Sequence, residues 1–474
     1  MHKSFRHISG AATPLALAAL SLAVVAGLAL PMDAHASAFQ LKEDSAKAMG
    51  RAYAGSATAG NDVSVVANSP AAMSDLKGTY FQADVTAINF SAKFSGSATD
   101  AQGRPISGSN GGDAGTTLPV PALFFETQLS DRWHVGASFT VPFGFQTEYD
   151  RDFVGRYNGI KSKFESLDAT LSASFAVTDN FSVGASAIAQ KTSAELTSQI
   201  NYNGVGYQLG QQLGLIQPGQ GNVPNALIDT LIPPGTEGTA KVKGDDWGWG
   251  WQLGGYWKLS PNDRFSLNYR SKISHKLNGT ANFTVPDNVK SVMSLVGIDP
   301  TAADAPFQHT GGSANFTTPA VASASYWHQA EKFGVGIDLA WTKWDVFKNL
   351  TVDYSNPNQP ATTEAFNWHN TWYASIGGDY YVTDKLTLRG GIAVDTTPTT
   401  AKNRDVRVPD STRKMLSFGI GYQPTERFEI DASYAHIFVN KAHLDGSTSS
   451  TGDVVAGNFD DYGNLLSLSA QYHF

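Results

Sequence analysis

The side chains that most often carry out enzyme chemistry are dispersed along this chain of 474 residues. No motif pairs any histidine with a nearby serine or aspartate, and there is no cysteine. No metal-spaced group of histidines and carboxylates is present, and no phosphate-binding glycine loop follows a strand. A hydrolase would need such a constellation, so we expect no enzyme activity, no cofactor and no metal. The scattered histidines are His275, His328, His369, His436 and His473.

Apolar side chains at helical spacing in two long connections, 200–241 and 282–313, are better candidates for function. Such faces either form a groove that captures an apolar ligand or pack only on one another. The candidate groove residues are Val205, Leu209, Leu213, Ile216, Leu227, Leu231, Val289, Val292, Met293 and Val296.

Four basic residues could contact an anionic group on such a ligand, because a carboxylate is bound best by a cation. Arg270, Lys272 and Arg389 are candidates on the inward face of expected strands. The fourth candidate, Lys191, lies near a loop.

The elements that must position these residues are strands. In the last nine residues, Leu466, Leu468, Ala470, Tyr472 and Phe474 alternate with polar side chains. The same period of two recurs near 181–190, 265–270 and 386–393. A terminal strand that is apolar on one face and ends on an aromatic residue is typical of bacterial membrane barrels.

Connection lengths separate a barrel from a soluble sandwich. Six connections are short and polar, whereas seven are long. Short turns on one rim and long loops on the other predict an outer-membrane barrel of about 14 antiparallel strands, with both chain ends on the periplasmic side. The short turns are 130–132, 178–180, 260–263, 329–332, 383–385 and 423–426; the long loops are 96–117, 147–160, 200–241, 282–313, 344–365, 397–410 and 443–462.

The first residues have the features of a secretory signal peptide. Lys3 and Arg6 precede an apolar run from Leu15 to Leu30, and Ala34-His35-Ala36 provides a cleavage site. We expect 1–36 to be the signal, 37–78 a separate segment and 79–474 the barrel. No later stretch is apolar enough for a membrane helix, and a net charge of −8 argues against nucleic acid as a partner.

Two further features belong to the expected wall. Trp247, Trp249, Trp251 and Trp257 share one strand face and predict an outward aromatic girdle, while the glycines between them leave room in the lumen for a plug or a ligand. Pro142 lies within a strand, where it cannot donate a hydrogen bond, so that strand should be bent or unpaired there. A harmless bulge is the alternative.

The segment 37–78 is rich in small residues and weakly apolar, which suits a plug inside the barrel. Its motifs, and others along the barrel, resemble the FadL family of long-chain fatty acid transporters over the whole mature chain. Ser69 interrupts the family's Asn-Pro-Ala motif. The matching stretches are Ser37-Ala38-Phe39-Gln40-Leu41, 50–55, Asn68-Ser69-Pro70-Ala71, Val141-Pro142-Phe143-Gly144-Phe145, 247–251, 269–271, 388–395 and Val408-Pro409-Asp410.

The resemblance implies passive transport of hydrophobic molecules across the outer membrane of a Gram-negative bacterium. Capture in the loop groove would be followed by rearrangement of the plug, or hatch, and lateral exit through a strand kink. It assigns Phe39, Asn68, Pro70 and Ala71 to the hatch, and Pro142, Phe143, Gly144 and Asp395 to the lateral gate. Expected partners are membrane lipid, lipopolysaccharide and the barrel assembly machinery, with the protein a monomer.

The cargo stays open. Two basic ligand-site positions of the best-known transporters align near Ser198 and Glu364, which are not basic. Long-chain fatty acids are the first expectation, and uncharged compounds such as aromatic hydrocarbons are the alternative. A general porin would have no reason for a hatch or for apolar loop helices, and a purely adhesive role for the loops is a further alternative.

Overall fold

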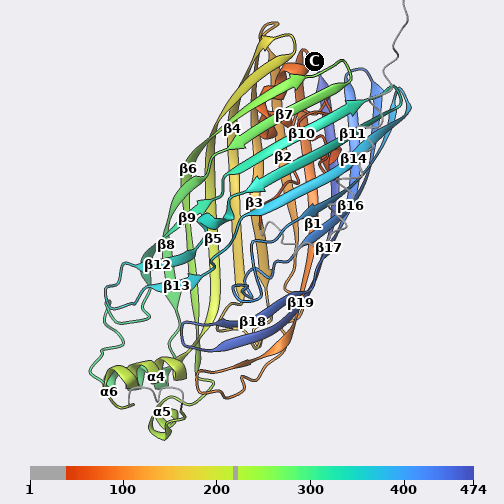
Figure 1. Cartoon of the computed structure of the whole chain (residues 1–474). Helices are drawn as coiled ribbons and strands as arrows, with labels where there is room; N and C mark the ends of the chain where they lie inside the picture. The colour runs from red at the N-terminus through yellow and green to blue at the C-terminus, as the bar shows by residue number, and fades with distance from the viewer. Residues whose placement is uncertain (1–38, 217–222) are drawn as a thin grey trace, which may run out of the picture. The chain divides into compact units, whose positions relative to one another are not determined.

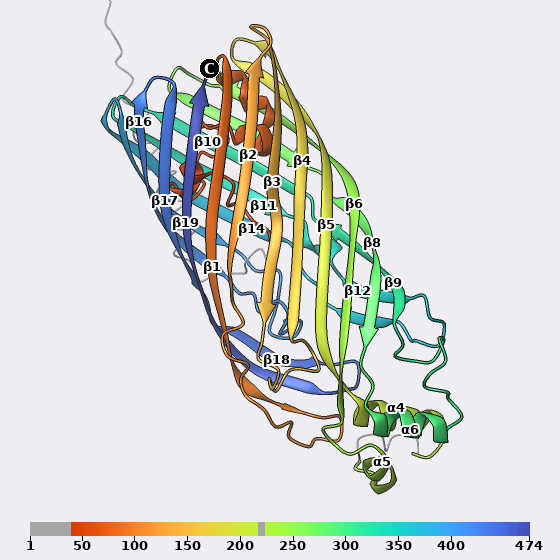
Figure 2. The same cartoon turned by 180° about the vertical axis from the view of Figure 1, so that it is seen from behind.

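The computed structural model describes residues 39–216 and 223–474, so the expected signal peptide lies outside the described residues. These residues form one antiparallel sheet that closes on itself, because β1 (Thr79–Thr99) pairs with both β2 (Thr117–Gln128) and β19 (Val454–His473). Figures 1 and 2 show the resulting barrel from two sides. Closure pairs the first strand of the chain with the last, which removes the two edge strands that an open sheet would expose to lipid.

The barrel has 14 strands, as expected. Five of them are interrupted, so the described residues contain more strand segments than barrel strands: β7 continues as β8, β9 as β10, β11 as β12, β13 as β14 and β17 as β18. The remaining strands are β3 (Trp133–Glu148), β4 (Lys161–Thr178), β5 (Phe181–Asn201), β6 (Glu237–Lys258), β7 (Asp263–Arg270), β8 (Ile273–Phe283), β9 (Thr310–Thr318), β10 (Val321–Gln329), β11 (Phe333–Thr342), β12 (Asn349–Tyr354), β13 (Thr362–Ala365), β14 (Thr371–Thr383), β15 (Leu386–Asp395), β16 (Arg413–Thr425), β17 (Phe428–Val439) and β18 (Ala442–Thr448).

The six short turns are confirmed as strand connections at one rim, which is at the top of Figure 1. The expected loop 443–462 is mostly wrong: β18 and β19 occupy most of it, and only 449–453 lies between them. The strands reach further because β19 pairs with β1 from His473 up to Val454. Among the described residues, no helix is both long and apolar enough to cross a bilayer.

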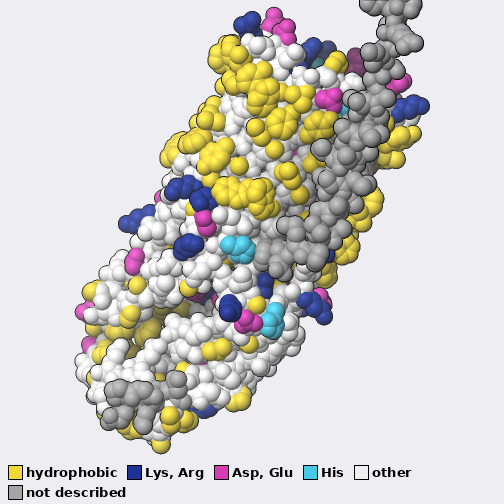
Figure 3. All heavy atoms as spheres, in the orientation of Figure 1, with side chains coloured by type: hydrophobic (Ala, Val, Ile, Leu, Met, Phe, Trp, Pro, Cys, Tyr) yellow, Lys and Arg dark blue, Asp and Glu magenta, His cyan; other side chains and the backbone are white. Residues whose placement is uncertain are grey.

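The outer surface of the barrel has an apolar belt. In Figure 3 hydrophobic side chains gather over the half nearest the short turns, and a row of lysines, arginines and carboxylates follows below them. Trp247, Trp249 and Trp251 are outward and exposed, Trp249 by 76%, and Trp257 lies half-buried on the same face. This agrees with an aromatic girdle in contact with lipid.

The segment before β1 packs inside the barrel as a plug of short helices: α2 (Ala46–Met49), α3 (Val65–Asn68) and the 3₁₀ helix η1 (Pro70–Asp75). Glycines of the wall allow its backbone to approach closely. A Cβ at Gly184 would lie 2.2 Å from the amide nitrogen of Ala71, and one at Gly391 would lie 2.1 Å from the carbonyl oxygen of Arg51. Any side chain at these two wall positions would therefore push the hatch away.

The glycines between the girdle tryptophans have a different neighbour from the one expected. Cβ atoms at Gly248 and Gly250 would meet Ile273 and His275 of β8, at 2.6 Å, and not the hatch or an open lumen. These inward side chains of β8 fill the space because β8 is paired to the extracellular half of β6.

Candidate functional site

The wall opens between β2 and β3. Their ladder runs only from Gln128–His134 to Leu123–Phe139, so the extracellular half of β3 is not paired with β2. On its other side, the β3–β4 register shifts between Thr140 and Phe143. Pro142 lies in that shift and has no N–H to donate. The expected bend and loss of pairing at Pro142 are present.

The first residues of the hatch pair with the bent part of β3. The amide of Leu41 donates to the carbonyl of Pro142 at 2.8 Å, and the amide of Gly144 donates to the carbonyl of Phe39 at 2.9 Å. A Cβ at Gly144 would lie 3.3 Å from Leu41. The N-terminal segment thus acts as a short extra strand on β3 where β2 has left it.

The side chain of Phe39 fills an aromatic pocket and is 4% exposed. Ring centroids of its neighbours lie 4.8 Å away for Trp344, 4.9 Å for Phe164 and 5.5 Å for Trp368. Tilted and edge-on arrangements like these are favourable for aromatic pairs. The buried members of this aromatic pocket are Phe39, Phe143, Phe164, Leu277, Phe316, Trp344, Phe347, Phe366, Trp368 and Val408.

A cavity of about 130 Å³ lies beside the segment that carries Phe39. Its lining includes the predicted residues Asn68, Pro142, Phe143 and Arg270. A smaller cavity of about 30 Å³ is lined by Asp395 and shares Gln40, Lys42, Tyr53 and Tyr373 with the larger one. The predicted gate residue Asp395 therefore lies near the same N-terminal segment as Pro142, on another wall.

The four candidate cations are placed differently from one another. Arg270 lines the larger cavity but pairs with Asp168 at 2.5 Å. Arg389 is buried against Asp431 at 2.5 Å, under the hatch. Lys191 pairs with Asp245. The inward position expected for Lys272 is wrong: the strand is interrupted between β7 and β8, so Ser271 is buried there and Lys272 is exposed. The structure brings only Arg270 of these four to the cavity.

Sequence reasoning missed both the aromatic pocket and a buried cation beside it, Arg407. Its Nε donates to Glu364 at 3.1 Å, and its Nη1 donates to Ser162 at 3.2 Å. The density of aromatic residues at 344–368 was the one local signal for the pocket. No local sequence signal indicated the pairing of Arg407, because its partners come from distant parts of the chain.

The extracellular loops carry the helices α4 (Tyr202–Gln212), α5 (Ala226–Leu231) and α6 (Asp287–Leu295), at the far end from the short turns (Figure 1). Some predicted groove residues pack inward: Val289, Val292 and Met293 lie with Tyr202, and Ile216 lies with Tyr207.

Other predicted groove residues face outward. Leu213 and Leu227 are each 53% exposed, and Leu231 and Val296 are also exposed. Val205 and Leu209 are half-buried. Some of the predicted groove residues thus pack against one another and others form an exposed apolar surface. Ligand capture by these residues stays a prediction.

The hatch motif makes polar contacts in the lumen. Asn68 donates to Asp44 at 3.0 Å, and Ser69, the residue that interrupts the family motif, shares a hydrogen bond of 2.8 Å with Ser266 of β7. Pro70 begins η1, and the carbonyl of Ala71 accepts from Ser174 at 3.1 Å. Ser69 therefore adds a wall contact and does not leave the motif unanchored.

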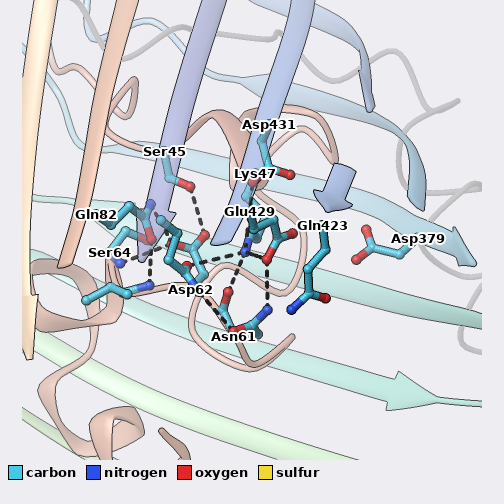
Figure 4. Close-up of polar contacts among 12 residues, drawn as sticks. Ser45, Lys47, Asn61, Asp62, Ser64, Gln82, Asp379, Gln423, Glu429 and Asp431 are labelled. Atoms are coloured by element: carbon cyan, nitrogen blue, oxygen red, sulfur yellow. Dashed lines mark hydrogen bonds and ion pairs between the residues drawn. The ribbon is translucent and has the colours of Figure 1, made fainter. Parts of the chain in front are cut away.

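An ion network holds the body of the hatch to the wall (Figure 4). Lys47 pairs with Glu429 at 2.9 Å, and Arg51 pairs with Asp379 at 3.0 Å. Removing one partner of a buried pair leaves an uncompensated charge, which is strongly unfavourable. We infer that residues from α2 onward are fixed more firmly than the segment 39–44.

The pKa values of two hatch carboxyl groups, Asp44 and Asp62, are shifted in opposite directions. Burial raises the pKa of Asp44 to about 8, against the lowering effect of the Asn68 hydrogen bond, and the nearby charge of Asp62 raises it further. Burial also acts to raise the pKa of Asp62, but Lys47 and Arg51 hold it below its usual value. Asp62 thus belongs to the fixed network, whereas Asp44 lies beside the cavity as a group that readily takes a proton.

Comparison with known proteins places these features in context. The family model for the outer membrane protein transport protein (OMPP1/FadL/TodX) matches residues 27–474. The long-chain fatty acid transport protein of Escherichia coli O6:H1 is 28% identical over 424 residues, covering 88% of this chain and 90% of that protein.

Two solved structures extend the comparison. The crystal structure of a Pseudomonas aeruginosa FadL homologue superposes with a TM-score of 0.83 at 30% identity, covering 92% of this chain and all of that one. The Pseudomonas putida toluene transporter TodX has a TM-score of 0.63 at 18% identity, covering 92% and 100% of the two chains, which shows a common fold.

Proposed function

Since this chain belongs to the outer membrane protein transport family (OMPP1/FadL/TodX), we propose that it is a passive channel for hydrophobic small molecules, foremost long-chain fatty acids. Its location is the outer membrane, with both chain ends on the periplasmic side. The family consists of transporters, in keeping with the expectation that this chain is no enzyme.

One observation carries the proposal: a single segment both fills an apolar pocket and closes a gap in the wall. Phe39 occupies the aromatic pocket, and the backbone of Phe39 and Leu41 is bonded to β3 where β3 has left β2. A ligand tail that replaces Phe39 would therefore also release the strand contact. Ligand binding and gate opening are thus coupled through one short peptide.

The route has three steps. The exposed apolar side chains on α5 and at the ends of α4 and α6 capture the cargo outside, and the aromatic pocket then accepts its tail in place of Phe39. The cargo leaves sideways between β2 and β3 into lipid, so that it never crosses the polar lumen. The ion pairs of Lys47 and Arg51 keep the rest of the hatch in place, which limits leakage of polar solutes.

Uncharged hydrocarbons are a second candidate cargo. Two cations beside the pocket and the cavity, the buried Arg407 and the half-buried Arg270, are already paired with carboxylates. A neutral ligand needs no free cation, and the structural relative TodX is a toluene transporter.

Uptake by whole cells that lack their own transporter tests the proposal. Gly144→Arg places a long side chain in the gap and should abolish uptake of labelled oleate, with barrel folding followed by heat-modifiable gel migration. Gly446→Arg on β18 is the matched control, since a Cβ at Gly446 meets only Val454 of β19, at 3.2 Å. Wild-type uptake by Gly144→Arg would exclude the lateral route and favour an axial path past the hatch.

A further inference from the structure

A polar layer lies directly against the aromatic pocket. Arg407 is 5% exposed, and its guanidinium donates to Glu364, to Ser162 and, at 3.4 Å, to the carbonyl of Thr197. These partners come from β13, β4 and β5, and the carbonyl of Arg407 itself accepts from Thr147 of β3 at 2.9 Å. Arg407 is thus held firmly in position from several sides.

The polar layer and the pocket share their strands. Ser162 and Phe164 are alternate inward residues of β4, and Glu364 and Phe366 are separated by the same two positions. Residues two apart on one face of a strand are about 7 Å from each other. The guanidinium of Arg407 therefore lies next to the aromatic rings, about two residues along the strand toward the extracellular side. A cation and an apolar pocket in this order match the head group and the tail of an amphiphile.

Both halves of this arrangement are occupied by the chain's own groups. Phe39 fills the place of a tail, and the carboxylate of Glu364 fills the place of an anionic head at Arg407. The second oxygen of Glu364, Oε2, is buried and has no hydrogen-bond partner among the described residues.

We propose that Glu364 is a built-in competitor for the anionic head group at Arg407, and so sets the preference of this channel between ionised and uncharged cargo. This inference rests on the proposed function. An ionised fatty acid must displace Glu364 or place a second negative charge beside it, and like charges at one site repel. An alcohol or a hydrocarbon of the same length meets no such penalty.

Two ligands of equal chain length, one ionised and one uncharged, test whether Glu364 competes with an anionic head group. Purified protein is titrated with decanoate and with 1-decanol at pH 8, where decanoate is ionised, and the fluorescence of Trp344 and Trp368 in the pocket reports binding. Glu364→Gln should raise the affinity for decanoate about tenfold, equivalent to about 1.4 kcal/mol, and change that for decanol less than twofold. Arg407→Gln should cancel this gain when combined with Glu364→Gln.

Glu195→Gln is the control, because Glu195 also forms one ion pair, with Lys241 at 3.0 Å, on the outer face of β5. An unchanged decanoate affinity in Glu364→Gln, or an equal gain for both ligands, would overturn the competitor role. Failure of every folded variant to bind either ligand would instead contradict the proposed function. Heat-modifiable migration confirms in each case that the barrel is folded.

Discussion

Lys47 of the hatch and Glu429 of β17 form a buried ion pair of 2.9 Å, and Lys47 also donates to the carbonyl of Asn61. The same lysine therefore ties two parts of the hatch to one wall of the barrel. By contrast, the segment 39–41 is bonded through its backbone to β3, on another wall. The hatch therefore has a fixed body and a separately attached N-terminal arm, residues 39–44.

The arm should compete with cargo. Phe39→Ala removes the ring from the aromatic pocket, so that a ligand no longer has to displace it. Burial of a phenylalanine is worth about 1.5–3 kcal/mol, and we expect the affinity for decanol to rise about tenfold or more. Phe94→Ala, which removes a buried ring from a different cluster near the first loop, is the control and should leave the affinity unchanged.

The arm should also respond to pH through Asp44. Its pKa of about 8 in the docked state lies above the ordinary value near 3.9. The docked state thus binds more protons between these values, so docking weakens as pH rises from about 4 to 8 and levels off above. Hydrogen exchange of the Leu41 amide should become faster across this window.

Asp44→Asn should flatten that pH profile while keeping the arm docked. Asp287→Asn serves as the control, because the Asp287 side chain is 97% exposed on α6. A wild-type exchange profile, after correction for intrinsic rates, that is flat from pH 5 to 9 would rule out a role for Asp44.

The loop helices should act at low cargo concentration. Leu213→Asp with Leu227→Asp places charges on exposed apolar positions without disturbing a packed side chain. Burial of each leucine side chain against a ligand is worth about 1–2 kcal/mol, allowing for partial exposure. Uptake should fall several-fold at nanomolar oleate and recover at micromolar oleate; equal uptake across the dilution series would show that these faces do not capture cargo.

The fixed body should not be needed for barrel closure. Deletion of residues 37–78 leaves the β1–β19 ladder intact, so heat-modifiable migration should survive while permeability to polar solutes increases. Loss of assembly would mean that the hatch is part of the folding nucleus of the wall.

The barrel could be predicted from sequence because strand alternation and turn lengths are local signals. The bend in β3 could be predicted from Pro142 because a proline has no N–H to donate in any strand, which is also a local signal. The aromatic pocket was not predicted, since Phe39 meets Trp344 across about 300 residues, and no local pattern records that meeting. The Glu364–Arg407 pair was missed in the same way, and sequence alone showed only that position 364 is not basic.

The position of the hatch before β1 also constrains the order of assembly. The wall glycines allow the hatch backbone to lie in direct contact with the wall, so a folded plug fits the finished lumen closely. We therefore expect residues 39–78 to enter while the sheet is still open, before β19 pairs with β1. For this protein, the final hydrogen bonds between β1 and β19 seal the plug inside as they complete the wall.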